Sequence, residues 1–227
     1  MGYAEVFAAL AAIAILAMYL RNIHVDVAFV RSAVDRKEYL VLRKEDSQSA
    51  ADCLARLNGR VRKLMTAMDR DLPEKESADK GRLDDEGVDR RKVLKNLKMR
   101  YRRTALSEGG TDTSVTAYSE GKGERIVICL RERDLAGRLG KLEDDNTLTY
   151  VLLHELGHLA TDEIGHVPAF WANFRYILDV AEREGIYKKV DYAATPQGYC
   201  GIKITSSASF PRNGSHGTGR KGSSGDD

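Results

Sequence analysis

The residues whose types and spacing could do chemistry lie in the stretch 147–171, which reads TLTYVLLHELGHLATDEIGHVPAFW. His154, Glu155 and His158 form the pattern H-E-x-x-H, and His166 follows after seven intervening residues. On a helix, positions four apart lie one turn apart on the same face, so His154 and His158 can present two imidazole nitrogens to one metal ion. Glu155 then lies beside the metal without ligating it, where its carboxylate can take a proton from a water that the metal activates.

The competing interpretation is that these histidines are ordinary hydrogen-bonded core side chains. Against it, three of the chain's five histidines fall within one short stretch, and polar groups in a Leu-rich run are costly to bury without partners. Three protein ligands leave the fourth position of tetrahedral zinc open, which is typical of a catalytic rather than a structural site. We therefore expect Zn²⁺ to be held by His154, His158 and His166, with Glu155 as the catalytic residue.

Two helices must position these side chains. Asn146 and Thr147 are good N-caps, and the apolar residues that follow recur at helical spacing, which predicts a helix through the H-E-x-x-H motif. Pro168 suits the first turn of a second helix, which we expect to end at about Glu184. His166 then lies in the short connection between the two helices.

The segment HELGHLATDEIGHVPAFW resembles the WLM and SprT-like zinc metallopeptidases, in which H-E-x-x-H is followed by Gly-His-x-x-x-Phe. The flanking segments SEGGTDTSVTAYSEGKGERIVICLR and GIYKKVDYAATPQGYCGIKIT are similar to WLM-like metallopeptidases, many of them encoded by large DNA viruses. The resemblance covers roughly residues 35–205 and is most specific at the zinc motif. The spacing of the third histidine excludes the metzincin pattern H-E-x-x-H-x-x-G-x-x-H.

This resemblance implies an α+β, zincin-like domain with a small sheet and an active-site helix, hydrolysing peptide bonds in a protein or peptide substrate. Two alternatives stay open. One is a DNA-associated repair protease of the SprT/Wss type. The other is a catalytically silent binding module that keeps the zincin-like fold.

Composition narrows the class of protein only slightly. The chain has 227 residues, 42% of them hydrophobic and 31% charged, as in ordinary globular proteins. The net charge of +2 favours no particular class of partner. Cys53, Cys129 and Cys200 are too few and too widely spaced for a disulfide framework, so we expect unpaired, buried cysteines in a reducing compartment.

The N-terminal stretch, residues 3–20, is apolar apart from Glu5 and just long enough to cross a bilayer. It predicts an uncleaved transmembrane anchor at residues 1–22, and the basic residues after it place the following domain in the cytoplasm. A secretory signal and a buried core helix are the alternatives. Residues 35–205 would form the metallopeptidase domain, and residues 206–227, rich in Ser and Gly, a disordered tail.

Two further helices are predicted before the motif. The first begins near Asp46 or Ser47. Its apolar stripe consists of Ala50, Leu54, Leu57, Val61, Leu64 and Met68. The second lies in the segment that begins at Arg90 and ends at Arg103 (RRKVLKNLKMRYRR), which has eight basic residues and no acidic one. We favour a solvated helix face, with binding to nucleic acid or to an anionic membrane surface as alternatives.

Short strands complete the predicted domain. Residues 37–43, 114–118 and 124–131 read as strands, the last two joined by the turn Ser-Glu-Gly-Lys-Gly, whereas residues 107–111 read as a loop. By analogy of position, RIVICLR is the candidate strand for pairing with an extended substrate, and ordinary sheet core is the alternative. Beyond the second helix of the motif, three tyrosines could stabilise an oxyanion, although packing is the default for all of them. These are Tyr187, Tyr192 and Tyr199.

Overall fold

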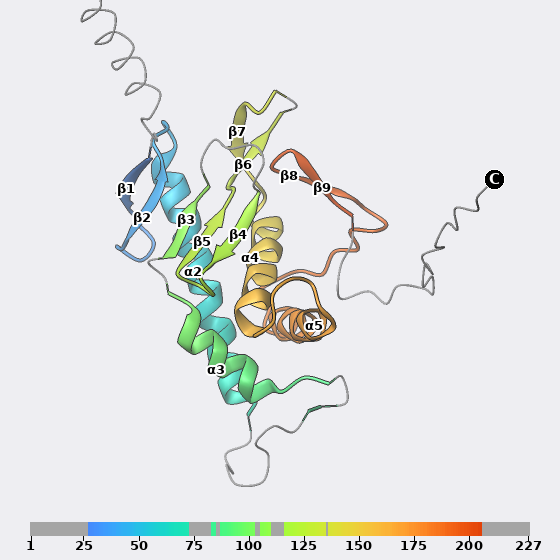
Figure 1. Cartoon of the computed structure of the whole chain (residues 1–227). Helices are drawn as coiled ribbons and strands as arrows, with labels where there is room; N and C mark the ends of the chain where they lie inside the picture. Colours follow the sequence, from blue (N-terminus) through green and yellow to red (C-terminus); the bar gives the residue numbers. More distant parts are fainter. Residues whose placement is uncertain are drawn as a thin grey trace, which may run out of the picture.

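The computed structural model describes residues 27–72, 83–84, 87–102, 105–109, 116–134 and 136–205. Within them the chain forms an α+β fold of four helices and nine strands (Figure 1). The main sheet has the strand order β1-β2-β3-β5-β4. Its strands are β1 (Val27–Arg31), β2 (Glu38–Leu42), β3 (Leu106–Glu108), β4 (Ala117–Glu120) and β5 (Arg125–Ile128). β3 runs parallel to both of its neighbours, and the two outer pairs are antiparallel.

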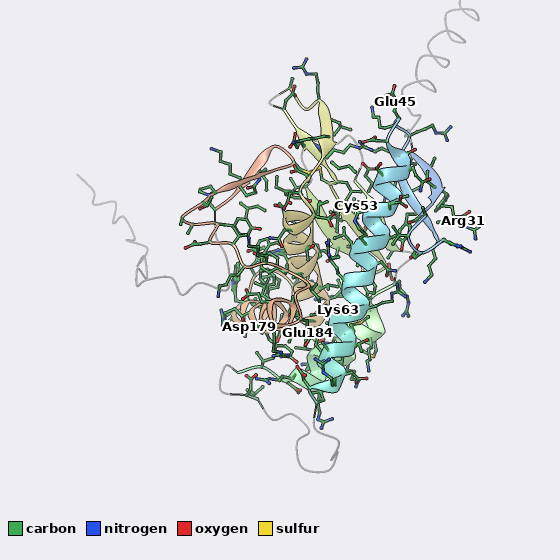
Figure 2. All side chains as sticks on the ribbon, turned by 180° about the vertical axis from the view of Figure 1, so that it is seen from behind. Arg31, Glu45, Cys53, Lys63, Asp179 and Glu184 are labelled. Carbon is green, nitrogen blue, oxygen red and sulfur yellow. A yellow bond between two sulfur atoms is a disulfide. The ribbon has the colours of Figure 1, made fainter. Side chains whose placement is uncertain are left out.

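The helices pack around the active-site helix. They are α2 (Ser47–Arg70), α3 (Arg90–Arg100), α4 (Asp145–Ala160) and α5 (Pro168–Arg183). α2 and α4 contact the sheet and each other, while α3 and α5 contact α4. In the opposite view, α2 lies in front of the sheet and of α4 (Figure 2). A helix with partners on so many sides has few exposed side chains, and most residues of α4 are buried.

The predicted stripe on α2 is confirmed, because all six of its residues are buried in the core. Asp46 precedes the helix, as expected, but its side chain caps no backbone N–H. Its carboxylate instead accepts a hydrogen bond from Arg131, 2.6 Å away. The other end of α2 is tied to α5, since Lys63 donates to the carbonyl oxygen of Glu184 (Figure 2).

The predicted transmembrane helix and single-pass membrane location are not supported and are corrected here. Among the described residues, no helix is both long enough and apolar enough to cross a bilayer. Residues 1–22, to which the anchor was assigned, lie outside the described residues, as does the predicted tail at residues 206–227. The described residues form an α+β fold.

The predicted loop at residues 107–111 is also wrong in part, because β3 occupies the central position of the sheet there. Glu108 in β3 is 4% exposed and accepts hydrogen bonds from the Arg131 side chain and from the backbone N–H of Leu42. A buried carboxylate needs such partners. The two glycines after Glu108 favour a turn in the local sequence, and Ser107 and Glu108 form a strand only through pairing with β2 and β5, which are distant in the chain.

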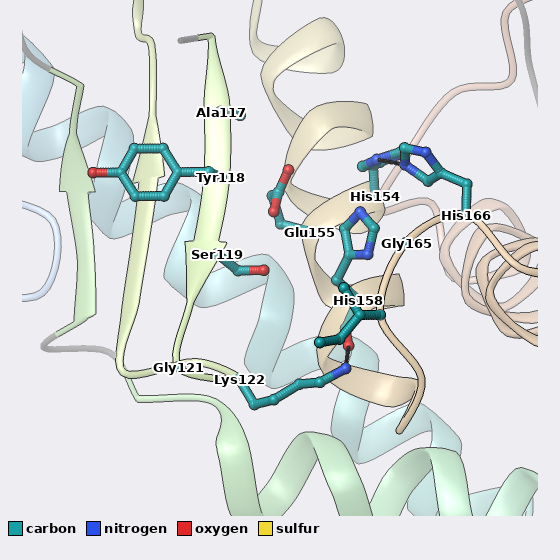
Figure 3. Close-up of a pocket in the computed structure, with 11 residues that line it drawn as sticks. Ala117, Tyr118, Ser119, Gly121, Lys122, His154, Glu155, His158, Gly165 and His166 are labelled. Atoms are coloured by element: carbon teal, nitrogen blue, oxygen red, sulfur yellow. Dashed lines mark hydrogen bonds between the residues drawn. The ribbon is translucent and has the colours of Figure 1, made fainter.

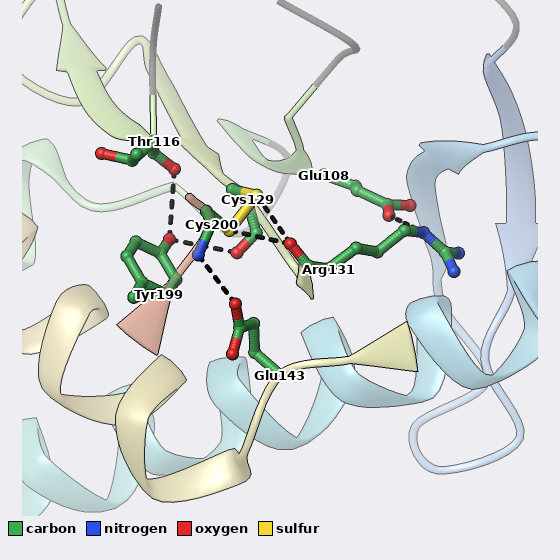
Figure 4. The surroundings of a disulfide bond; sticks show 7 residues. All are labelled: Glu108, Thr116, Cys129, Arg131, Glu143, Tyr199 and Cys200. Atoms are coloured by element: carbon green, nitrogen blue, oxygen red, sulfur yellow. Dashed lines mark hydrogen bonds and ion pairs between the residues drawn. A yellow bond between two sulfur atoms is a disulfide. The ribbon is translucent and has the colours of Figure 1, made fainter. Parts of the chain in front are cut away.

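The prediction of three unpaired cysteines is wrong. Cys129 and Cys200 form a disulfide that joins the end of β5 to the hairpin of β8 (Gln197–Tyr199) and β9 (Ile202–Ile204) (Figure 4). The Tyr199 hydroxyl lies 3.1 Å from the Thr116 carbonyl oxygen and 3.0 Å from that of Cys129. Glu143 accepts a hydrogen bond from the Cys200 backbone N–H.

Glu143 follows the second small hairpin, formed by β6 (Arg131–Arg133) and β7 (Leu139–Leu142). Cys53 is the free cysteine, and its burial raises the pKa of its thiol to about 11. Because two of the three cysteines form a disulfide, the cysteines no longer indicate a reducing compartment.

Candidate active site

α4 presents the H-E-x-x-H motif from the interior of the fold. The N-cap is Asp144, two residues before the predicted cap Asn146. Its side chain accepts hydrogen bonds from the backbone N–H groups of Asn146 and Thr147. An aspartate at this position satisfies two donors of the first turn and favours the helix dipole. The helix continues without interruption through His154 and His158, which therefore lie one turn apart.

The three predicted metal ligands lie together. His154, His158 and His166 each offer a ring nitrogen, and these three atoms lie within 4.8 Å of one another. The Nε2 atoms of His154 and His166 are 3.0 Å apart (Figure 3). Two nitrogens bound to one tetrahedral zinc at 2.0–2.1 Å would be about 3.3 Å apart. The donor set and its spacing therefore fit a zinc ion bound by three imidazoles.

His166 lies in the connection of seven residues, 161–167, that joins α4 to α5. The chain turns at Gly165, whose φ of 85° suits glycine, and α5 then begins at Pro168 as predicted. Phe170 on the first turn of α5 stacks on the His158 ring at 4.4 Å and packs edge-on against His154. These aromatic contacts restrict the orientation of the imidazoles.

Gly157 has a structural reason that the sequence did not reveal. A Cβ at this position would come within 2.9 Å of the Phe170 ring. Glycine in a helix interior is unfavourable by about 1 kcal/mol relative to alanine. Here it allows α5 to approach α4 closely enough for Phe170 to reach His158.

Burial sets the protonation of the two α4 histidines. Desolvation, together with the neighbouring imidazoles, lowers the pKa of His154 to about 3. Desolvation, followed by the effects of His166 and Lys122, lowers the pKa of His158 to about 4. Both rings are therefore neutral at pH 7. Neutral imidazole is the form whose lone pair binds a metal.

Glu155 has the opposite response to the same burial. It is 5% exposed, and desolvation raises the pKa of its carboxyl to about 7, partly offset by a hydrogen bond with Ser119. Its side chain points from α4 toward β4, into the pocket and away from the cluster of imidazoles (Figure 3). It lies beside the cluster of the three histidines and does not belong to it.

A pocket of about 500 Å³ opens between α4 and β4. Its walls are the histidine cluster with Glu155, the connection at residues 164–166, and β4 with the turn after it. The lining residues on the strand side are Ala117, Tyr118, Ser119, Gly121 and Lys122. Tyr187, Tyr192 and Tyr199 do not line this pocket and are buried elsewhere, as the default interpretation expected.

The predicted substrate strand is wrong, because β5, which contains most of RIVICLR, pairs on both sides, with β3 and with β4. β4 is the strand at the edge of the sheet beside the pocket. The Cys129 N–H donates to the Thr116 carbonyl, which fixes the alternation of the ladder. It follows that the backbone groups of Ala117 and Ser119 face the open edge.

Two carboxylates, those of Asp162 and Glu163, also lie in the connection between α4 and α5. Asp162 forms ion pairs with Lys92 and Arg100, and Asn96 donates to the same carboxylate. These contacts lower its pKa to about 2. Glu163 is exposed. Neither carboxylate belongs to the cluster formed by the three histidines.

Four of the eight basic residues of the segment from Arg90 to Arg103 form ion pairs with neighbouring acids. α3 contains six of the eight, including these four. The pairs are Arg90 with Asp84, Lys92 and Arg100 with Asp162, and Lys98 with Asp69. The favoured interpretation of α3 as a structural helix is consistent with these contacts, and nucleic-acid binding stays an untested alternative.

Sequence reasoning missed two residues of the pocket, Ser119 and Lys122. Both lie in the stretch Ser-Glu-Gly-Lys-Gly, which was read only as a turn. The position of Lys122 between two glycines was the available signal, since glycines on both sides favour a tight turn with an unusual backbone conformation.

Comparison with known proteins finds similar proteins of large DNA viruses. The chain is 30% identical over 195 residues to "Uncharacterized protein R325" of Acanthamoeba polyphaga mimivirus, a match that covers 86% of this chain and 91% of the relative. The chain belongs to the same protein family as R325. A shorter match, 29% identical over 98 residues, is to "Uncharacterized protein 136R" of Invertebrate iridescent virus 6 and covers 43% of this chain and 53% of the relative.

A third match, 39% identical over 61 residues, is between this chain and "Uncharacterized protein 042R" of Invertebrate iridescent virus 3. It covers 27% of this chain and 37% of the relative. No model of a known protein family and no solved structure matches the chain. The names of these relatives state no function, so the resemblance to WLM and SprT-like peptidases rests on the residues quoted above.

Proposed function

We propose that this protein is a zinc-dependent peptidase that hydrolyses peptide bonds in protein or peptide substrates. The observation that carries the proposal is the convergence of His154, His158 and His166 beside a buried glutamate on one wall of an open pocket. Three imidazoles are a common donor set for catalytic zinc, and they leave a position for water or substrate. The sequence resemblance to WLM and SprT-like peptidases points to the same activity.

In this proposal, a bound zinc ion would supply a Lewis acid for activating water and for polarising the carbonyl of the scissile peptide bond. His154 and His158 would hold the ion from α4, and His166 would hold it from the connection to α5. Glu155 accepts the proton of the attacking water and passes it to the nitrogen of the leaving amine. A carboxyl whose pKa is about 7 is suited to both steps, because general acid–base catalysis is most efficient near the working pH.

The open edge of β4 supports a mode of substrate binding. An extended peptide that pairs with the backbone of Ala117 and Ser119 would be held against the wall opposite Glu155. Ser119 then has two roles, since its backbone faces the substrate and its side chain hydrogen bonds to Glu155. Backbone pairing fixes the peptide without selecting particular side chains, which leaves the cleavage preference to the rest of the pocket.

The decisive experiment is Glu155→Gln in the full-length protein loaded with zinc. We expect peptide cleavage to fall by about 10²- to 10⁴-fold, the usual contribution of a general base, while one zinc per chain is retained. The assay is cleavage of a broad library of quenched fluorescent peptides, with the metal content of each variant measured in parallel. Glu124→Gln, which removes an exposed carboxylate from the turn after β4, is the matched control and should cleave like the wild type.

Cleavage that persists in Glu155→Gln would show that another group acts as the base and would contradict the assigned role. A wild-type protein that binds zinc but cleaves nothing in the library would favour the silent binding module.

A further inference from the structure

The C-terminal end of α4 is held by side chains from two other elements. The last carbonyl groups of a helix have no partners within it. Here Arg100 of α3 donates to the carbonyl oxygens of Leu159 and Thr161, at 2.8 and 3.2 Å, and Asn96 donates to that of Ala160 at 2.9 Å. The Lys122 ammonium, from the turn between β4 and β5, also donates to the Thr161 carbonyl, at 2.7 Å. It lies 3.4 Å from the carbonyl oxygen of His158 (Figure 3).

Lys122 holds an unfavourable backbone conformation to make these contacts. Its φ is 53°, between Gly121 at 57° and Gly123 at 104°. Left-handed backbone suits glycine and disfavours a residue with a Cβ. The turn is also packed tightly, because a Cβ at Gly123 would come 2.3 Å from the Arg100 carbonyl oxygen. Lys122 therefore makes the backbone of the turn less stable than glycine would, and its side-chain contacts offset this loss.

Those contacts continue toward the third histidine. The Lys122 ammonium lies 2.9 Å from the Glu163 carbonyl oxygen, three residues before His166. The side chains from Asp162 to His166 are exposed, so they gain little order from burial. A ligand on a segment of this kind must be ordered when the metal binds, at a cost in entropy, unless other contacts order it beforehand.

We propose that Lys122 is a positioning residue for the metal site. By holding the Thr161 and Glu163 carbonyls, it fixes the connection that brings His166 to His154 and His158. The inference rests on the proposed zinc site and deepens it, because it explains how a ligand on an exposed segment is presented to two ligands on a buried helix.

Charge and position predict opposite effects for Lys122, which makes the proposal testable. Its ammonium also lies 3.4 Å from the His158 carbonyl oxygen, so its positive charge is near the site and repels a cation there. Removing the positive charge alone should therefore strengthen zinc binding. Removing the contacts to the connection should weaken it.

The experiment measures zinc affinity, by competition with a chromophoric chelator, in the wild type, Lys122→Met, His166→Ala and the double variant. Methionine keeps a similar unbranched chain and removes the donors. We expect Lys122→Met to lower zinc affinity about tenfold when His166 is present, a usual effect for residues that orient metal ligands. In the His166→Ala background, it should lower affinity less than twofold. Lys95→Met, on the exposed face of α3, is the control for removal of a lysine and should bind zinc like the wild type.

An equal loss in both backgrounds would show that Lys122 acts on the fold in general and would overturn the proposal. Unchanged or stronger binding in Lys122→Met would overturn it in favour of charge alone. A wild type that binds no zinc would overturn the proposed function together with this inference, whereas the first two results leave the zinc site intact.

Lys122→Gly keeps the proposal testable even where the methionine variant folds poorly. Glycine relieves the left-handed backbone, so the metal-free variant should unfold at the same temperature as the wild type or higher. Its zinc affinity should nevertheless fall about tenfold. Wild-type zinc affinity in a stably folded Lys122→Gly protein would contradict the positioning role.

Discussion

Burial shifts the pKa values of two neighbouring residues of α4, His154 and Glu155, in opposite directions, and this difference determines which reactions each can take part in. The same loss of water that lowers the pKa of His154 raises the pKa of Glu155, because it disfavours the charged form of each. His154 and His158 stay neutral and can donate lone pairs. The glutamate can exchange a proton near pH 7. One apolar environment thus supports both the ligand and the base that the proposed reaction requires.

The Asp162 side chain predicts how the stability of the protein depends on pH. Contacts with Lys92 and Arg100 lower its pKa from 3.8 to about 2, so the folded state binds its proton less readily than the unfolded state. Its ion pairs therefore stabilise the protein fully above about pH 4, and the effect is lost as the pH falls toward 2. Asp162→Asn should destabilise the metal-free protein by about 1 kcal/mol at pH 7, a usual size for exposed pairs.

Urea unfolding of both proteins in the presence of a chelator, at pH 7, 4 and 3, measures this difference. The gap between the two free energies of unfolding should narrow as the pH falls. A gap of constant size would mean that the Asp162 carboxylate contributes nothing through its charge.

At the level of elements, local patterns in the sequence predicted the helices that carry the motif. The apolar periodicity of α2, the caps of α4 and the proline that begins α5 are all features of neighbouring residues. The convergence of three histidines was predicted for the same reason, since two lie on one helix and the third follows shortly after it.

Features that depend on distant pairing were not predicted. The central place of β3 and the edge place of β4 follow from which strands become neighbours, which no local pattern specifies. Cys129 and Cys200 are 71 residues apart, and nothing near either residue indicates the other. The contacts of Arg100 and Lys122 with the end of α4 likewise join segments that are far apart in the chain.

The edge strand gives a prediction about substrate binding. Ala117→Pro removes a backbone N–H that faces the open edge, where proline is tolerated in a sheet. If substrates pair with β4, kcat/KM for peptide cleavage should fall about tenfold or more, while zinc content stays at the wild-type level. Ala117→Val keeps the N–H and is the matched control. Equal kcat/KM for the proline and valine variants would show that this N–H does not bind the substrate.

At the scale of the whole molecule, the disulfide closes a loop that contains the entire histidine cluster. Because the cysteines are 71 positions apart, a cross-link of this kind stabilises by about 4 kcal/mol in the chain-entropy description. Reduction should lower the free energy of unfolding of the metal-free protein by up to that amount. The measurement is urea unfolding with and without a phosphine reductant.

The double variant Cys129→Ser, Cys200→Ser supplies the control, because the reductant should not change its stability further. Cys53 remains buried and free in both proteins. A wild type whose stability is unaffected by the reductant, and whose three thiols all react with an alkylating agent after unfolding without reduction, would show that the bond does not form.

The central claim concerns the whole site: three imidazoles from two adjoining segments converge on one metal ion. X-ray absorption at the zinc edge of the purified full-length protein tests it most directly. The structure predicts one zinc per chain, with three imidazole nitrogens at 2.0–2.1 Å and one further light atom. A protein that takes up no zinc, or whose zinc is bound by sulfur or by fewer than three imidazoles, would contradict the claim.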